Sequence, residues 1–190
     1  DVLLALGVCI DPPIAIVEQC LEKVGICFCF APQLHPAMRH VASVRKQLDT
    51  PTIFNLLGPL CNPASAPYQL LGVGKPAIRP LLADALCGLG TTRTVIVTGT
   101  DGLDEVTLNG PTDVLMIENE DVSEFQWEPC DFGISNSSLE SLRVENAEQS
   151  ANVIGQVLAG EAGPHRDIVV MNAAAALWVA DPKLGLKDCA

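Results

Sequence analysis

Residues 69–98 read QLLGVGKPAIRPLLADALCGLGTTRTVIVT and decide the class of fold. The short apolar run at 69–73 is typical of a buried strand. Lys75-Pro76 then opens a helix that ends near Gly90, because proline fits the first turn of a helix and glycine fits its end. Residues 94–98 are rich in β-branched side chains and predict a second strand. A strand, a helix and a strand in this order indicate an α/β fold.

The sequence on both sides of this unit extends the same pattern. After it we expect short strands at residues 105–108, 113–118 and 122–127, then helices at about 146–159 and 165–180. Before it we expect a helix capped by Asp11 and closed by Gly25, a buried strand at 26–30, and a helix at 36–48. The sequence therefore predicts one α/β domain, residues 1–190, with a mixed central sheet flanked by helices and a short β-meander.

Composition argues against several kinds of partner. The chain has 190 residues, of which 48% are hydrophobic and only 18% are charged, so it has enough apolar material for a core. A formal net charge of −12 opposes binding to nucleic acid and to anionic lipid. No apolar run reaches the roughly 20 residues that a membrane-spanning helix needs. We expect neither nucleic acid nor a membrane as a partner.

The cysteines bear on the cellular compartment. There are eight, most of them within apolar runs, and no pair has zinc-finger spacing. We interpret them as small buried hydrophobic residues in a reducing environment, which predicts a cytoplasmic protein without disulfides.

An acidic turn follows the strand predicted at 94–98. Residues 101–105 read Asp-Gly-Leu-Asp-Glu, and sites in open α/β sheets gather at the C-terminal ends of the strands. Adjacent carboxylates on a turn that contains glycine offer hard oxygen ligands to one or two Mg²⁺ ions. A cation there would also relieve the repulsion between neighbouring negative charges. From spacing alone, a solvated acidic turn without a ligand remains open as the alternative.

A second candidate site begins at His35. Positions 35, 38, 39 and 45 fall at helical spacing, so they can share one face of a helix. A guanidinium on that face could bind a substrate carboxylate through two parallel hydrogen bonds. The alternative is that Arg39, Arg45 and Lys46 are surface charges and that His35 caps the helix.

Residues 54–63, FNLLGPLCNP, form a third candidate. Glycine permits close approach of the backbone and proline stiffens a turn, so this segment could form an apolar wall against a flat ligand. A buried helix end would have the same composition.

Together these segments carry a resemblance that none of them carries alone. The motifs are HPAMRHVA at 35–42, VRK at 44–46, TIFNLLGPL at 52–60, NPA at 62–64, GLDEV at 102–106 and NAAAAL at 172–177. In order and spacing the chain resembles the anthranilate phosphoribosyltransferases, over essentially its whole length. Members of that family transfer the phosphoribosyl group of phosphoribosyl pyrophosphate to anthranilate and release pyrophosphate, in tryptophan biosynthesis. The resemblance implies the large α/β domain of the nucleoside phosphorylase/phosphoribosyltransferase fold.

The resemblance also implies roles for individual residues. Arg45 matches the arginine that binds the carboxylate of anthranilate. The positions that line the anthranilate channel are matched by His35, Met38, Gly58 and Pro59. Asp104 and Glu105 match the acidic pair that holds Mg²⁺ against the pyrophosphate, so Mg²⁺ is the expected cofactor. No nucleophile, acid or base is assigned.

Two motifs of the family do not occur in the 190 residues. They are a glycine-rich phosphate loop, Gly-Thr-Gly-Gly-Asp, and a Lys-His-Gly-Asn-Arg segment, both of which precede this region in the family. We therefore expect a fragment of a longer two-domain enzyme, without its N-terminal helical domain and inactive alone. Intact members are homodimers, but most of that contact comes from the helical domain, so the resemblance implies no dimer for this chain.

Two other functions remain open. One is a truncated, non-catalytic paralogue or partner subunit, which the missing phosphate loop would also predict. The other is an enzyme similar to the pyrimidine nucleoside phosphorylases, which share the fold. Such an enzyme would need a phosphate site and residues that read a nucleobase, and the sequence shows neither.

Overall fold

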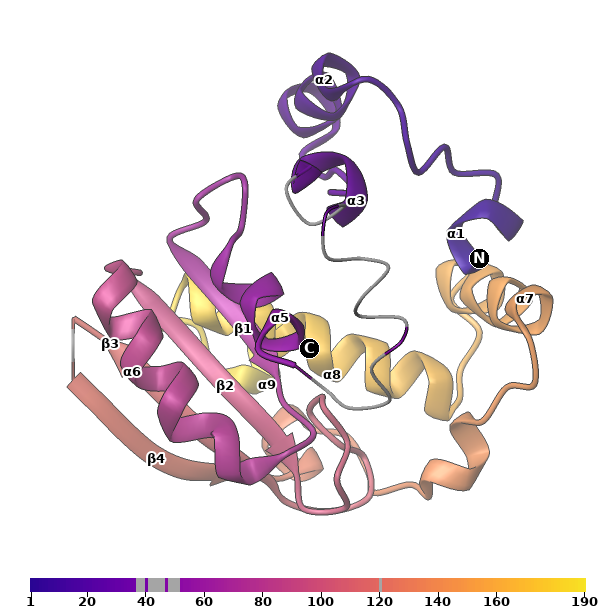
Figure 1. Ribbon diagram of the computed structural model, residues 1–190. Helices are drawn as coiled ribbons and strands as arrows, with labels where there is room; N and C mark the ends of the chain where they lie inside the picture. Colours follow the sequence, from indigo (N-terminus) through magenta and orange to yellow (C-terminus); the bar gives the residue numbers. More distant parts are fainter. Residues whose placement is uncertain (37–39, 41–46, 48–51, 120) are drawn as a thin grey trace. The chain divides into compact units, whose positions relative to one another are not determined.

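Figure 1 shows a computed structural model of the chain that describes residues 1–36, 40, 47, 52–119 and 121–190. It divides into two compact units: Asp1–Ser65 with Asn146–Ala151, and Ala66–Glu145 with Asn152–Ala190. We describe each unit by itself.

The first unit is built from short helices. They are α1 (Val2–Ala5), α2 (Ile14–Val24), α3 (Ala31–Leu34), α5 (Phe54–Leu57) and the 3-10 turn η2 (Gly58–Leu60), together with the start of α7 (Ala147–Leu158). Helix α2 ends as predicted, because Gly25 adopts a left-handed conformation with φ +83°. Its start was predicted wrongly: the N-cap is Pro13, and no side chain caps the helix there.

The strand predicted at residues 26–30 is wrong. This segment has no regular secondary structure, and Ile26 and Phe28 are 71% and 44% exposed. An apolar run becomes a strand only where a second strand offers hydrogen bonds, and composition alone cannot supply that partner. The helix predicted at 36–48 lies almost entirely outside the described residues.

The second unit contains a four-stranded sheet in the order β1-β2-β3-β4. Its strands are β1 (Tyr68–Gly72), β2 (Arg93–Gly99), β3 (Thr112–Glu118) and β4 (Asp121–Trp127). Strands β1 and β2 are parallel, whereas β2, β3 and β4 form an antiparallel meander. The predicted mixed sheet with a short β-meander is therefore confirmed. The strand predicted at 105–108 is wrong, because these residues belong to the loop between β2 and β3.

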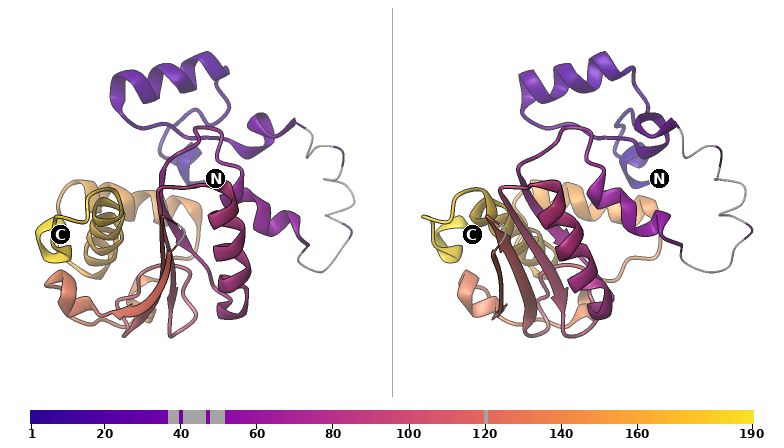
Figure 2. Two further views of the ribbon diagram at one scale, coloured as in Figure 1. Left: turned by 90° about the vertical axis from the view of Figure 1, so that its left-hand side faces the viewer. Right: turned by 60° about the vertical axis from the view of Figure 1, so that its left-hand side comes forward.

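Helices cover both faces of the sheet. The connection from β1 to β2 runs through the turn η3 (Pro76–Ile78) and helix α6 (Arg79–Leu89), as the sequence predicted. Figure 2 shows α6 on one face and α8 (Pro164–Ala180) on the other. Helix α9 (Leu186–Cys189) packs against α8 and the turn η4 (Pro129–Phe132), and the turn η5 (Leu139–Leu142) also contacts α8.

The main core lies between the sheet and α8. It contains Val95, Val97, Val106, Leu108, Val114, Trp127, Phe132, Met171, Ala174, Ala175 and Val179. Small alanines on the helix allow it to approach the β-branched residues of β2 closely. Trp127 and Trp178 meet edge to face with ring centroids 5.4 Å apart.

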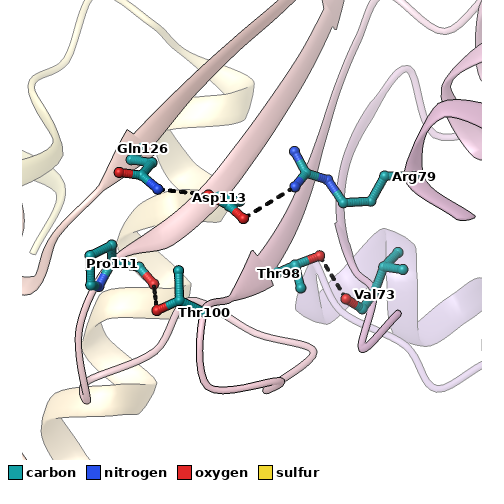
Figure 3. Close-up of polar contacts among 7 residues, drawn as sticks. All are labelled: Val73, Arg79, Thr98, Thr100, Pro111, Asp113 and Gln126. Atoms are coloured by element: carbon teal, nitrogen blue, oxygen red, sulfur yellow. Dashed lines mark hydrogen bonds and ion pairs between the residues drawn. The ribbon is translucent and has the colours of Figure 1, made fainter. Parts of the chain in front are cut away.

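The opposite face is held by apolar packing and one ion pair. Leu82 and Leu86 of α6 are buried. Arg79 of α6 lies 3.6 Å from the carboxylate of Asp113 in β3, and the side-chain amide of Gln126 in β4 donates to the same carboxylate at 2.8 Å (Figure 3). One carboxylate therefore connects a helix and two strands.

The prediction that the cysteines are buried hydrophobic residues is wrong. All eight lie among the described residues and are free thiols, but none is buried. Cys130, for example, is exposed in the turn η4, whereas Phe132 of the same turn is buried in the core. No helix among the described residues is long and apolar enough to span a membrane.

Candidate functional site

The site is built on the loop that connects β2 to β3, residues 100–111, which we call the acidic loop. Asp104 and Glu105 lie in it, and we call these two residues the acid pair. They flank the C-terminal ends of β1 and β2, where open α/β sheets bind ligands. The acid pair lines a pocket of about 450 Å³ together with Leu70, Gly72, Val97, Ile168, Val169, Asn172 and Ala173.

Gly72 at the end of β1 fixes how closely the acidic loop approaches the sheet. A Cβ atom at this position would lie 1.7 Å from the carbonyl oxygen of Asp104. No side chain fits in that space, so glycine is required for the loop to lie where it does. The backbone of the acid pair therefore rests directly on the edge of β1.

Asp101 builds the turn that precedes the acid pair. One of its carboxylate oxygens accepts a hydrogen bond from the Leu103 amide at 3.1 Å, and the other accepts from the Thr107 hydroxyl at 2.6 Å. Both oxygens are therefore engaged within the loop. Of the three acids in the sequence motif, the two of the acid pair are the ones that line the pocket.

Threonine hydroxyls fix the surrounding backbone. Thr98 near the end of β2 donates to the carbonyl of Val73 at 2.7 Å, which joins the ends of the two parallel strands. Thr100 donates to the carbonyl of Pro111 at 2.9 Å and closes the base of the acidic loop (Figure 3). The loop is irregular, but its two ends are held on the sheet.

The two negative charges of the acid pair repel each other. Partial burial of the carboxyl of Glu105, and secondarily the negative charge of Asp104, raise its pKa above the ordinary value, although the residue as a whole is exposed. A cation beside the pair would stabilise the ionised form of Glu105.

The donor set fits Mg²⁺. Among the described residues, no three His, Cys, Asp or Glu side chains are grouped so that they could hold a metal ion. Two carboxylates beside an open pocket match the usual protein contribution to Mg²⁺, which completes its coordination with water and substrate phosphates. The residues that would hold it are Asp104 and Glu105.

The remaining residues predicted for the site belong to the first unit. His35 is half-buried and ends α3, where its amide donates to the carbonyl of Ala31 at 2.9 Å. Gly58 and Pro59 form the start of η2. A Cβ on Gly58 would meet nothing within 4 Å, so no described part of the chain requires glycine there. Arg45 and Met38 lie outside the described residues.

Two residues that fix the backbone of the acidic loop, Gly72 and Asn172, were not identified as site residues from the sequence. Gly72 carried a usable signal, because an isolated glycine inside a strand pattern often marks a close backbone approach. Asn172 is the only side-chain amide in the run MNAAAALWVA. It was noted as part of a motif, but its contact with a loop 66 residues away could not be read from the sequence.

The chain belongs to the glycosyl transferase family, a/b domain, whose sequence profile matches residues 1–189. It is similar to named enzymes of one kind. It is 47% identical to the anthranilate phosphoribosyltransferase of Acetivibrio thermocellus over 94% of this chain and 52% of that protein. It is 46% identical to the enzyme of the same name from Chromobacterium violaceum over 99% of this chain and 55% of that protein.

Solved structures give the same result. The anthranilate phosphoribosyltransferase of Thermus thermophilus matches with a TM-score of 0.88 and 38% identity, over 99% of this chain and 56% of that one. The Saccharomyces cerevisiae enzyme in complex with PRPP and Mg matches with a TM-score of 0.89 and 30% identity, over 99% and 55%. The predicted fold class and the resemblance to this family are confirmed, and the chain spans about half the length of these relatives.

Proposed function

We propose that this chain supplies part of the active site of an anthranilate phosphoribosyltransferase of tryptophan biosynthesis. The observation that carries the proposal is the acid pair beside a pocket at the C-terminal ends of two parallel strands. The similarity to enzymes of that name supports the choice of reaction. In it, the amine nitrogen of anthranilate bonds to ribose C1 of phosphoribosyl pyrophosphate, the bond from C1 to pyrophosphate breaks, and the amine loses a proton.

The acid pair serves the donor substrate. Asp104 and Glu105 would hold Mg²⁺, and the chemistry that this ion would supply is compensation of negative charge on the pyrophosphate leaving group. The chain supports this role with a rigid backbone, since β1 contacts the carbonyl of Asp104 and the bonds of Asp101 shape the preceding turn. A yeast relative binds PRPP and Mg, which is consistent with this role.

The first unit serves the acceptor. Arg45 pairs with the carboxylate of anthranilate. The walls of the channel come from His35, Met38, Gly58 and Pro59. The aromatic amine is mostly neutral near pH 7, so it needs orientation more than activation, and a fixed carboxylate supplies that orientation.

We also propose that the protein is cytoplasmic and that residues 1–190 form a single α/β domain. A reducing compartment suits eight free thiols, three of them exposed.

A chimeric enzyme tests the proposal. Residues 1–189 replace the matched part of the Thermus thermophilus enzyme, which supplies the rest of its own chain. We expect conversion of anthranilate and phosphoribosyl pyrophosphate to the phosphoribosyl product, measured by chromatography. Replacing the acid pair by Asp104→Asn with Glu105→Gln should lower kcat/KM by about 100-fold or more, because several kcal/mol of charge stabilisation is lost.

The matched control is Asp121→Asn with Glu124→Gln, which removes the same two charges from exposed positions of β4 and should leave the rate unchanged. A folded chimera without product would favour a non-catalytic protein. An active chimera that is indifferent to loss of the acid pair would refute the role of Asp104 and Glu105.

A further inference from the structure

Asn172 of α8 forms a two-point contact with the backbone of Val106. The Val106 amide donates to Oδ1 of Asn172 at 2.9 Å, and Nδ2 of Asn172 donates back to the Val106 carbonyl at 3.0 Å. The same Nδ2 also donates to the carbonyl of Ile168 one turn earlier in the helix, at 3.0 Å. One side-chain amide therefore makes three hydrogen bonds and joins α8 to the acidic loop.

This contact replaces a strand partner. Val106 is 1% exposed but lies outside every strand, so its amide and carbonyl find no ladder to join. An unpaired backbone amide or carbonyl at such depth would destabilise the fold, because it loses its hydrogen bonds to water without gaining others. The side chain of Asn172 presents a carbonyl and an amide in the arrangement that a neighbouring strand would offer, and it satisfies both groups.

The position of the contact connects it to the acid pair. Val106 directly follows Glu105, and Asn172 lines the same pocket as Asp104 and Glu105. On the N-terminal side of the acid pair, the carbonyl of Asp104 lies against the backbone of Gly72 in β1. The acid pair is therefore held between a strand at one end and a helix at the other.

Helix α8 is a firm anchor for the acidic loop because its packing against the sheet resists displacement. Met171 and Ala175, on the same stretch of α8, are completely buried in the core against the sheet. Moving Asn172 would require repacking these residues, which costs free energy in a close-packed core.

We propose that Asn172 is a positioning residue: it fixes the peptide of Val106 and thereby sets the direction in which the acid pair presents its carboxylates to Mg²⁺. The inference rests on the proposed role of Asp104 and Glu105 as the metal ligands. Outer contacts that orient metal ligands typically contribute about 10–100-fold to metal affinity or activity.

The first test needs no metal. Amide hydrogen exchange of the chain is followed at Val106 in Asn172→Ala and in the control Asn152→Ala, the same change at an exposed position of α7. We expect exchange at Val106 to accelerate about tenfold or more in Asn172→Ala, because one bond worth about 1.4 kcal/mol protects it. The control should match the unchanged chain. Equal protection in both variants would overturn the proposed contact.

The second test measures metal dependence in the chimeric enzyme. Asn172→Ala should raise the Mg²⁺ concentration for half-maximal rate by about tenfold, and leave the KM for anthranilate unchanged. A purely structural residue would lower the folded fraction and depress the rate equally at every Mg²⁺ concentration. That uniform loss, or an unaltered Mg²⁺ dependence, would overturn the positioning role.

Two further variants keep the result decisive. If Asn172→Ala does not fold, Asn172→Gln retains the amide but displaces it by one methylene, and we expect the same shift in Mg²⁺ dependence. The acid-pair variant Asp104→Asn with Glu105→Gln separates the two proposals. If the acid-pair variant keeps the Mg²⁺ dependence of the rate, the proposed function fails. If the acid-pair variant loses that dependence while Asn172→Ala leaves it unaltered, only the inference about Asn172 fails.

Discussion

Glu105 combines a functional position with an unfavourable environment. Burial of its carboxyl and the charge of Asp104 raise its pKa in the folded chain. A raised folded pKa favours the protonated form, so ionised Glu105 destabilises the fold. This penalty is absent below the ordinary glutamate pKa and is fully present above the raised one.

Glu105→Gln should therefore stabilise the metal-free chain at about pH 8 and have no effect at about pH 3.5, below the ordinary glutamate pKa. Because Glu105 is exposed, solvent screening keeps the gain below about 1 kcal/mol. Urea unfolding at both pH values measures it, with Glu124→Gln on β4 as the control. An equal gain at both pH values would contradict the electrostatic origin.

Gly72 and Gly74 make a matched pair. A Cβ on Gly72 would collide with the Asp104 carbonyl at 1.7 Å, whereas one on Gly74 would meet Gly102 and Asp104 at ordinary contact distances of 3.5 and 3.8 Å. We expect Gly72→Ala to cost about 1–3 kcal/mol in the free energy of unfolding and Gly74→Ala to be nearly neutral. Thermal and urea unfolding measure both, and equal costs would show that the loop is free to move away from β1.

Arg45 provides a prediction about the acceptor substrate. In the chimeric enzyme, Arg45→Ala should raise the KM for anthranilate about tenfold or more, because a charge-assisted pair with the carboxylate is lost. The KM for phosphoribosyl pyrophosphate should change little. Steady-state kinetics with each substrate varied in turn measures the split, and equal effects on both constants would rule out the assigned role.

At the level of elements, an ion pair between Arg79 and Asp113 joins α6 to β3. Arg79 is only 8% exposed, and its Nε finds no partner among the described residues, so the contact with Asp113 is its main compensation. Removing Asp113 would leave a guanidinium buried without a counter-charge.

We therefore expect Asp113→Ala to destabilise the chain by about 2 kcal/mol, less than for a fully buried pair because Asp113 is partly exposed. Asp121→Ala, at an exposed position of β4, is the control. The double change Arg79→Met with Asp113→Ala should recover part of the loss. Urea unfolding of the unchanged chain, the two single variants and the double variant gives the coupling energy, and a value near zero would mean that the two side chains do not interact.

The elements differ in how far the sequence predicted them. The strand–helix–strand unit from β1 to β2 was correct, because hydrophobic pattern, β-branching and glycine and proline signals all agreed there. The same local reasoning failed at residues 26–30 and 105–108. Residues 26–30 are a short apolar run, whereas residues 105–108, Glu-Val-Thr-Leu, alternate polar and apolar side chains. Whether either segment joins a sheet depends on a partner strand distant in sequence.

For the whole molecule, the core is distributed unequally. Of the buried hydrophobic residues, only Val17 and Ala151 belong to the first unit among the described parts of the chain, and all the others belong to the second. On α2, Ile14, Ile16, Leu21 and Val24 are all more than 40% exposed. Local stability follows buried apolar contact, so the two units should differ in resistance to opening.

Hydrogen exchange of the chain should show this difference. We expect amides in β2 and β3 to exchange only through global unfolding, with α2 amides exchanging through local opening at a much lower free energy. Exchange measured against increasing urea separates the two modes. If α2 is protected to the same free energy as β2, the two units would share one cooperative core.

The sequence by itself determined the presence of enough apolar residues for a core, the order of the main strands and helices, the acidic motif and the family. These follow from local patterns of hydrophobicity, turn residues and motif spacing. Only the tertiary structure decided that the acid pair shares a pocket with α8, that Gly72 must lack a side chain, and that Asn172 bonds to the backbone of Val106. Each of these depends on atoms brought within about 3 Å of one another by folding, and no local pattern encodes which distant backbone groups will need a partner.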